Sequence, residues 1–143
     1  MLKKSPLIPL VFTVLLDMIG IGIIIPVLAP LMYDPTNSIL PSDTSESLRG
    51  ILLGLLVASY SFMQFFGAPV LGALSDTHGR KKILLISLCG TFIGYLLFAI
   101  GIIYQNIYIL FLSRFIDGFT GGNISVANSA IADVSDAKSK AKN

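Results

Sequence analysis

Three long runs with almost no charge constrain what this chain can fold into. The segment 5–33 carries one charged residue, Asp17, and the segments 50–75 and 83–113 carry none. A helix needs about 20 consecutive, mostly apolar residues to cross the hydrocarbon core of a bilayer. Each run is long enough, so the sequence predicts a membrane protein made of spanning helices. Composition agrees, because only 13% of the residues are charged, whereas a soluble domain has about 25%.

The third run is too long for one span, and its polar interruption Tyr104-Gln105-Asn106 divides it in two. We therefore predict an all-α, polytopic membrane helix bundle with four spans. They lie near residues 7–32, 50–75, 83–103 and 107–131. The first run could instead be a secretory signal, but it is too long for one and shows no convincing small-residue cleavage site.

The segment 34–49 is rich in Pro, Ser, Thr and Asp and connects the first two spans. We expect an irregular outer connection with a helix start near 43–45 and no chemistry of its own.

The basic residues predict how the chain is oriented. Eight of the ten lie before the first span, between the second and third, or after the fourth: Lys3, Lys4, Arg80, Lys81, Lys82, Lys138, Lys140 and Lys142. Arg49 alone lies in the predicted outer connection, and Arg114 lies within the fourth span. Because basic residues favour the cytoplasmic side, we expect a multi-pass protein of the cytoplasmic membrane with both termini in the cytoplasm.

The sequence offers little for enzyme or metal chemistry. Cys89 and His78 are the only residues of their kinds, so no internal disulfide or histidine-rich metal site is expected. The glycines form no P-loop or dinucleotide fingerprint. We therefore expect no enzymatic activity, no cofactor, no metal and no nucleic-acid partner.

Three ionisable residues lie where lipid should be: Asp17, Arg114 and Asp117. A charge near the centre of a spanning helix costs about 2.5–3.5 kcal/mol, so such residues face a protein interior or a water-filled cavity. Asp17 lies roughly 15 Å from the cytoplasmic end of its span, and Arg114 roughly 10 Å from the outer end. A long arginine side chain can cover the remaining gap in a core about 30 Å thick. The two residues can therefore meet if their helices are neighbours.

Buried charges in membrane helices mark proton and substrate pathways, which favours a functional role for Asp17 and Arg114. Asp117 is within reach of Arg114 on the same helix. It either neutralises that arginine locally or takes part in transport, and both alternatives stay open. Gln64, on the otherwise apolar second span, either forms an interhelical hydrogen bond or lines a cavity.

Small residues recur at helical spacing in several spans, which lets helix backbones pack closely in lipid. We interpret as packing positions Gly50, Gly54, Ala58, Gly90, Gly94, Gly118, Gly121, Gly122 and Ser125. In the first span, Gly20, Gly22, Pro26 and Pro30 are expected to bend or loosen the helix, since proline removes a backbone donor.

Three stretches carry a family resemblance. GALSDTHGRKKIL, residues 72–84, resembles the signature between helices two and three of the major facilitator superfamily, G-x-L-[AS]-D-x-x-G-R-[KR]-x-x-L. RFIDGFTGG, residues 114–122, is similar to the superfamily's helix-four motif. The run at 16–30 is similar to helix one of drug/proton antiporters of the tetracycline exporter type.

The resemblance implies the N-terminal portion of a transporter with about twelve spans in two halves and a cavity between them. It implies proton-coupled efflux of a drug or other small molecule by alternating access, with Asp17 and Arg114 in the pathway. The implied partners are the substrate, protons, membrane lipid and the remaining half of the transporter. We expect a fragment that is inactive alone.

The resemblance also implies a gate that latches the outward-facing state. Its residues are Gly72, Asp76, Gly79, Arg80, Lys81 and Asp133. In this gate, Gly72 packs against the other half, and Asp76 and Arg80 join a charge network with Asp133, for which Asp136 is the rival partner.

Two other interpretations remain. The chain could be a complete four-span transporter that works as a dimer, since small multidrug exporters also carry an acidic residue in helix one. It could also be a structural or partner-binding membrane protein.

Overall fold

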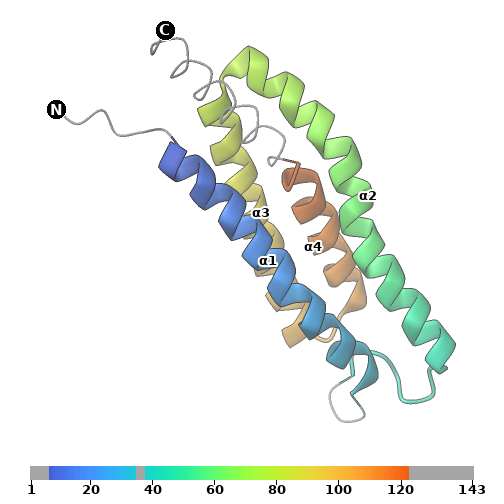
Figure 1. The fold of residues 1–143 in the computed structure, drawn as a ribbon. Helices are drawn as coiled ribbons and strands as arrows, with labels where there is room; N and C mark the ends of the chain where they lie inside the picture. The colour runs from blue at the N-terminus through green and yellow to red at the C-terminus, as the bar shows by residue number, and fades with distance from the viewer. Residues whose placement is uncertain (1–6, 35–37, 123–143) are drawn as a thin grey trace, which may run out of the picture.

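The computed structural model describes residues 7–34 and 38–122, which form helices joined by short connections. The helices are α1 (Leu7–Tyr33), α2 (Glu46–His78), α3 (Arg80–Ile103) and α4 (Ile107–Thr120). In Figure 1, α4 lies between α2 and α3, and its most extensive contacts are with these two helices. The all-α fold predicted from the sequence is confirmed for the described part of the chain.

Three of these helices are long and apolar enough to cross a membrane: α1 over residues 14–33, α2 and α3. With 33 residues, α2 is about 50 Å long and exceeds a hydrocarbon core of about 30 Å. It must therefore tilt or extend past the core. The structure describes 14 residues of α4, and the predicted continuation to 131 lies outside the described residues.

Side-chain caps define where α2 and α4 begin. The Ser45 hydroxyl accepts a hydrogen bond from the Leu48 amide at 3.3 Å, so α2 starts at the expected place. Arg49 consequently lies in the first turn of α2 rather than in an irregular part of the connection, and its predicted side of the membrane stays a prediction. The Asn106 side chain accepts from the amides of Tyr108 and Ile109, and α4 begins directly after it. The polar interruption therefore divides the third apolar run as predicted.

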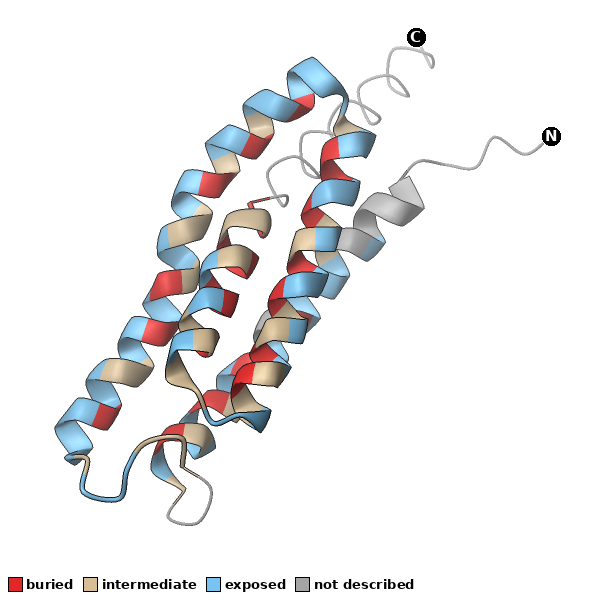
Figure 2. Ribbon diagram, turned by 180° about the vertical axis from the view of Figure 1, so that it is seen from behind, coloured by how far each residue is buried: buried red, intermediate tan, exposed pale blue. Residues whose placement is uncertain are grey.

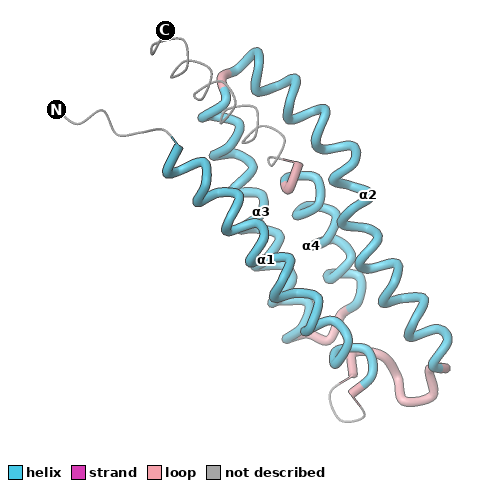
Figure 3. The backbone as a smooth tube through the Cα atoms, viewed as in Figure 1, coloured by secondary structure: helices cyan, strands magenta, loops and turns pink. Residues whose placement is uncertain are grey.

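The charged stretch 72–82 is almost entirely helical, although the sequence suggested a loop. Figure 3 shows a single short break between α2 and α3. The break is Gly79, which adopts a φ of 88°, a backbone conformation that favours glycine. Its amide donates to the Ser75 carbonyl at 3.0 Å. We call this end of the bundle the junction end, and the opposite end, where α1 connects to α2 and α3 to α4, the connection end (Figure 1).

The hydrophobic core lies toward the connection end. Its buried residues are Ile24, Leu28, Met32, Leu56, Phe98 and Leu110. Figure 2 shows that buried positions recur along one side of each helix while the opposite side is exposed. Large apolar residues occupy those exposed sides, including Phe65 and Phe92 with 75% and 68% of their surface exposed. Surfaces of this kind suit contact with lipid acyl chains.

Glycines bring the backbones of α2 and α4 into direct contact. A Cβ atom at Gly118 would overlap the Tyr60 carbonyl, and one at Gly67 would overlap the Phe119 carbonyl. A Cβ atom at Gly122 would lie 2.5 Å from the Ala68 amide nitrogen. Such approaches are possible only without a side chain. Gly54 differs, because its Cβ atom would meet nothing within 4 Å, so the packing role expected for it is absent from the described structure.

α1 remains helical through Pro26 and Pro30. That its prolines and glycines bend or loosen the helix stays a prediction. A Cβ atom at Gly20 would overlap the Tyr95 hydroxyl, so this glycine makes room for a side chain of α3. Around Gly22 nothing lies within 4 Å.

Replacing Gly118 by alanine should destabilise the bundle by about 1–3 kcal/mol, because the added methyl group overlaps a backbone carbonyl that cannot move freely. Thermal unfolding of the detergent-solubilised protein, followed by circular dichroism, measures the effect. Gly54→Ala is the matched control and should unfold at the wild-type temperature or slightly above it. Equal unfolding temperatures for the two variants would contradict the close contact between α2 and α4.

Candidate functional site

Three ionisable side chains are buried between the helices. Asp17 of α1 is 4% exposed, and Arg114 and Asp117 of α4 are each 2% exposed. Two of these residues share one face of α4, because a spacing of three residues is close to one helical turn. All three residues singled out from the sequence are therefore enclosed by protein.

Arg114 and Asp117 form a buried ion pair. The Nη1 atom of Arg114 lies 3.1 Å from Oδ2 of Asp117. Two aromatic rings of α3 complete the surroundings, with the guanidinium carbon 4.6 Å from the Phe98 ring centroid and 5.8 Å from that of Tyr95. Aromatic faces stabilise a nearby cation, and more so where water is excluded. Asp117 therefore neutralises the charge of Arg114 locally, which was one of the two roles considered for it from the sequence.

The approach of α4 to α3 depends on glycine at the level of this pair. A Cβ atom at Gly94 would lie 2.7 Å from the Asp117 Cβ. One turn earlier on α3, Gly90 makes room for Thr120 in the same way. Asp117 can therefore enter the interface only because its neighbour on α3 has no side chain.

Asp17 belongs to the same electrostatic cluster. Its carboxyl group is near enough for its charge to act on Asp117, Tyr60 and Tyr95, which come from three different helices. The structure thus brings the acidic residue of α1 close to the ion pair of α4. Direct pairing between Asp17 and Arg114 stays a prediction.

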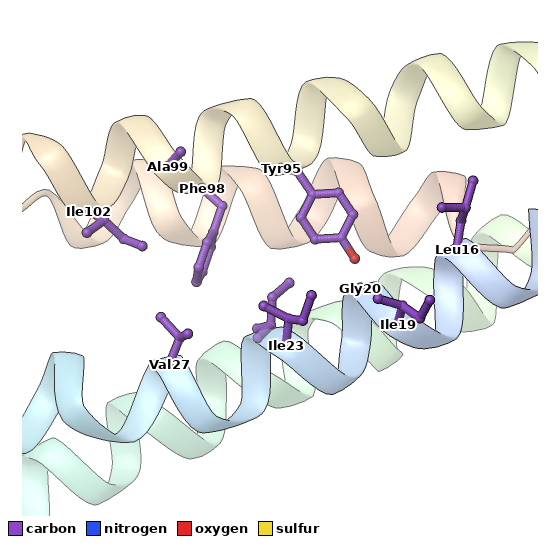
Figure 4. Close-up of a pocket in the computed structure, with 10 residues that line it drawn as sticks. Leu16, Ile19, Gly20, Ile23, Val27, Tyr95, Phe98, Ala99 and Ile102 are labelled. Carbon is purple, nitrogen blue, oxygen red and sulfur yellow. The ribbon is translucent and has the colours of Figure 1, made fainter.

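Sequence reasoning missed two tyrosines of this cluster. Tyr60 packs on Gly118 and Gly121 of α4, and the Tyr95 hydroxyl points toward Gly20 of α1 (Figure 4). A phenol inside an apolar helix is a polar group that needs a partner, which was the available signal. The partners themselves depend on which helices are neighbours, and the local sequence does not contain that information.

Gln64 connects α2 to α4. Its Nε2 atom donates to the Gly121 carbonyl at 3.1 Å and lies 3.5 Å from the Tyr60 hydroxyl. This contact favours the interhelical hydrogen bond over a cavity-lining role.

The predicted gate residues that the structure describes, Gly72, Asp76, Gly79, Arg80 and Lys81, lie at the junction end. Oδ1 of Asp76 is 4.0 Å from Nη2 of Arg80, and the side chains are 73% and 30% exposed. Lys81 is exposed, and a Cβ atom at Gly72 would meet nothing within 4 Å. Asp133 and Asp136 lie outside the described residues. An ion pair of this length at the surface contributes little to stability by itself. The charge network with Asp133 stays a prediction.

An apolar groove of about 370 Å³ separates α1 from α3 beside the charged cluster (Figure 4). Tyr95 lies at the level of Gly20 and is the lining residue that carries a hydroxyl group. The remaining lining residues are Leu16, Ile19, Ile23, Ile24, Val27, Phe98, Ala99 and Ile102. Within residues 7–34 and 38–122, no group of three or more His, Cys, Asp and Glu side chains is placed to hold a metal ion.

Spanning helices that enclose ionisable side chains beside an apolar groove define a polytopic α-helical membrane protein. Within that class the chain belongs to the Major Facilitator Superfamily, whose family model matches residues 10–142. The match covers nearly the whole chain and includes the three stretches that carried the resemblance. It favours the major facilitator interpretation over the small four-span dimeric exporter.

The chain is similar to several curated resistance proteins. It is 42% identical over 142 residues to the class C tetracycline resistance protein of Escherichia coli, covering 99% of this chain and 33% of that protein. It is 43% identical over 141 residues to the class H protein of Pasteurella multocida, covering 99% and 32%. It is 36% identical over 135 residues to the quinolone resistance protein NorA of Staphylococcus aureus, covering 94% and 31%. The chain thus spans about a third of the length of these relatives, and no solved structure matches it.

Asp117→Asn should destabilise the protein by about 3 kcal/mol, because it leaves the Arg114 guanidinium buried without its counter-charge. The double variant Arg114→Met/Asp117→Asn removes both charges and should regain most of that loss. Unfolding temperatures in detergent test this, with Asp43→Asn, an exposed residue of the connection, as the control. A double variant less stable than Asp117→Asn alone would show that the pair does not act as proposed.

Proposed function

We propose that this chain is part of a proton-coupled exporter of drugs or other small molecules that works by alternating access. The observation that carries the proposal is the enclosure of Asp17, Arg114 and Asp117 within spanning helices of a major facilitator protein. Charges held at this depth are retained where protons or charged substrates must pass. The similarity to tetracycline and quinolone resistance proteins supports the substrate class.

In this proposal Asp17 carries the proton, and Arg114 controls its charge state from a neighbouring position. A carboxyl group beside a cation in a partly dry site exchanges its proton in response to small changes in burial and distance. Asp117 holds Arg114 in place, and the apolar groove beside Tyr95 receives an apolar part of the substrate. Both ends of the chain lie in the cytoplasm, as the distribution of lysine and arginine indicates.

Substitution of Asp17 by asparagine should reduce efflux to the level of vesicles that lack the protein, because asparagine cannot release a proton. The measurement uses everted vesicles that contain the transporter of which this chain is part, an imposed pH gradient, and tetracycline and a quinolone as probes. Asp43→Asn removes an exposed carboxylate and should export at the wild-type rate. Unchanged efflux in Asp17→Asn, at equal membrane abundance, would reject the role of Asp17.

We further propose that Asp76 and Arg80 form part of a gate at the cytoplasmic face, together with Gly72, Gly79, Lys81 and Asp133. Gly79 confines the change of direction between α2 and α3 to one residue, so the two helices are joined directly at the proposed gate. Asp76 and Arg80 lie on opposite sides of this break. Each can exchange the other for a different charged partner when the two halves of the transporter move.

Asp76→Asn and Arg80→Ala should each lower the efflux rate per molecule while membrane abundance stays near the wild-type level. The reason is that both charges act during the change of state, whereas their pair, 4.0 Å long with Asp76 73% exposed, contributes little to the stability of the folded bundle. Efflux rates normalised to immunoblot intensity measure this. Wild-type efflux per molecule in both variants would remove the gate from the proposal.

A further inference from the structure

At the connection end of the bundle, the Arg49 side chain forms hydrogen bonds to the end of α1 and to the segment that connects α1 to α2. This side chain is 9% exposed. Nε donates to the Thr44 carbonyl at 3.1 Å, and Nη2 donates to the Pro41 carbonyl at 2.6 Å. Nη1 donates to the Ser38 hydroxyl oxygen at 2.7 Å and also to the Met32 carbonyl. One residue of α2 therefore binds the last turn of α1 and three points of the segment between the two helices.

The contact with Met32 satisfies a general need of helix ends. The last four carbonyl groups of a helix lack partners within the helix, and the negative end of the helix dipole favours a cation. The Ser38 hydroxyl also donates to the Met32 carbonyl at 3.1 Å, and the Ile39 amide donates to the Leu31 carbonyl at 3.0 Å. The planar fork of an arginine can serve several such acceptors at once, which a lysine cannot.

This anchor determines which part of α1 is held in place. The buried apolar residues of α1 are Ile24, Leu28 and Met32, which pack in the core toward the connection end. Closer to the junction end, the buried residues of α1 whose side chains the structure describes are Asp17 and Gly20, so no large apolar side chain among them is buried there. From Met32 to Asp17 the helix is roughly 22 Å long, so a tilt of about 5° around the anchored end displaces Asp17 by roughly 2 Å.

We propose that Arg49 is a positioning residue for Asp17. By fixing the connection end of α1 to α2, it sets how closely Asp17 approaches its ionisable neighbours. These are Tyr60 of α2, Tyr95 of α3, and Asp117 with its partner Arg114 on α4. The positioning role rests on the proposed function, because it assumes that Asp17 carries the proton. The hydrogen bonds by which Arg49 anchors α1 do not rest on that function.

The anchor is tested by the reactivity of a thiol placed beneath it. Met32→Cys is introduced together with Cys89→Ser, and the rate of reaction with a membrane-impermeant maleimide is measured in intact membranes. Met32 is fully buried, so the reaction should be slow. Arg49→Gln should accelerate it about tenfold, which matches the loss of hydrogen bonds to a charged group. Arg49→Lys should give an intermediate rate.

Glu46→Gln is the matched control, because Glu46 is exposed in the same first turn of α2, and its rate should equal that of the parent. If Arg49→Gln fails to accumulate, Ser38→Ala provides the second test. It removes one acceptor of Arg49 and one donor to Met32, and should accelerate labelling about threefold. If Arg49→Gln reacts with the maleimide at the same rate as the Met32→Cys/Cys89→Ser parent, the anchor is overturned. The same holds for Ser38→Ala where that variant replaces Arg49→Gln.

The positioning role is tested by the pH profile of tetracycline efflux in the complete transporter. Arg49→Gln should shift the pH midpoint, because Asp17 then lies at a different distance from its neighbours, and Arg49→Lys should restore part of the shift. A lower abundance with an unchanged midpoint per molecule would assign Arg49 a structural role only and overturn positioning. If the wild-type transporter does not export either probe, the proposed function fails, whereas the thiol measurement still decides the anchor.

Discussion

The ion pair between Arg114 and Asp117 is the interaction on which the arrangement of the described helices depends. Neither charge can face acyl chains at this depth without a cost of about 2.5–3.5 kcal/mol, so α4 must be surrounded by protein on the side that carries them. It lies between α2 and α3, where the pair is 2% exposed and the rings of Phe98 and Tyr95 cover the guanidinium. The position of α4 in turn places Gly94 against Asp117 and Tyr60 against Gly118. The same pair therefore accounts for glycines on α3 and on α4.

α1 is held mainly at one end and approaches the Arg114–Asp117 pair with its other half. It is anchored at the connection end by Arg49 and by its core residues, and it reaches the charged cluster through Asp17 and through the contact of Gly20 with Tyr95. An acidic residue on a helix held mainly at one end can change its distance to a fixed cation without disrupting the packing of the other helices. A helix of this kind suits a protein that must load and release a proton, since the affinity for the proton depends on that distance.

Much of this architecture could be predicted from the sequence, for physical reasons. Apolar runs of spanning length and the polar residues at 104–106 predict the helices, because lipid excludes unpaired backbone groups. Asp17, Arg114 and Asp117 were recognisable because charges are rare at such depth. The role of Arg49 was missed because its acceptors, the carbonyl groups of Met32, Pro41 and Thr44, are set by how the connection folds back on α2, which residue types do not show. The contact of Tyr95 with Gly20 and the single-residue break at Gly79 depend on distances between helices and on backbone geometry, neither of which a pattern of residue types contains.

The central claim is that the side of α1 bearing Asp17 faces the interior of the described helices, while the adjacent side is exposed on them. Paramagnetic accessibility of spin labels at positions 17 and 18, in a Cys89→Ser background and in lipid vesicles, tests it most directly. Met18 is 62% exposed whereas Asp17 is 4% exposed. Oxygen dissolved in the bilayer should therefore relax the label at position 18 much more strongly than the label at position 17. Equal or greater oxygen accessibility at position 17 would contradict the account.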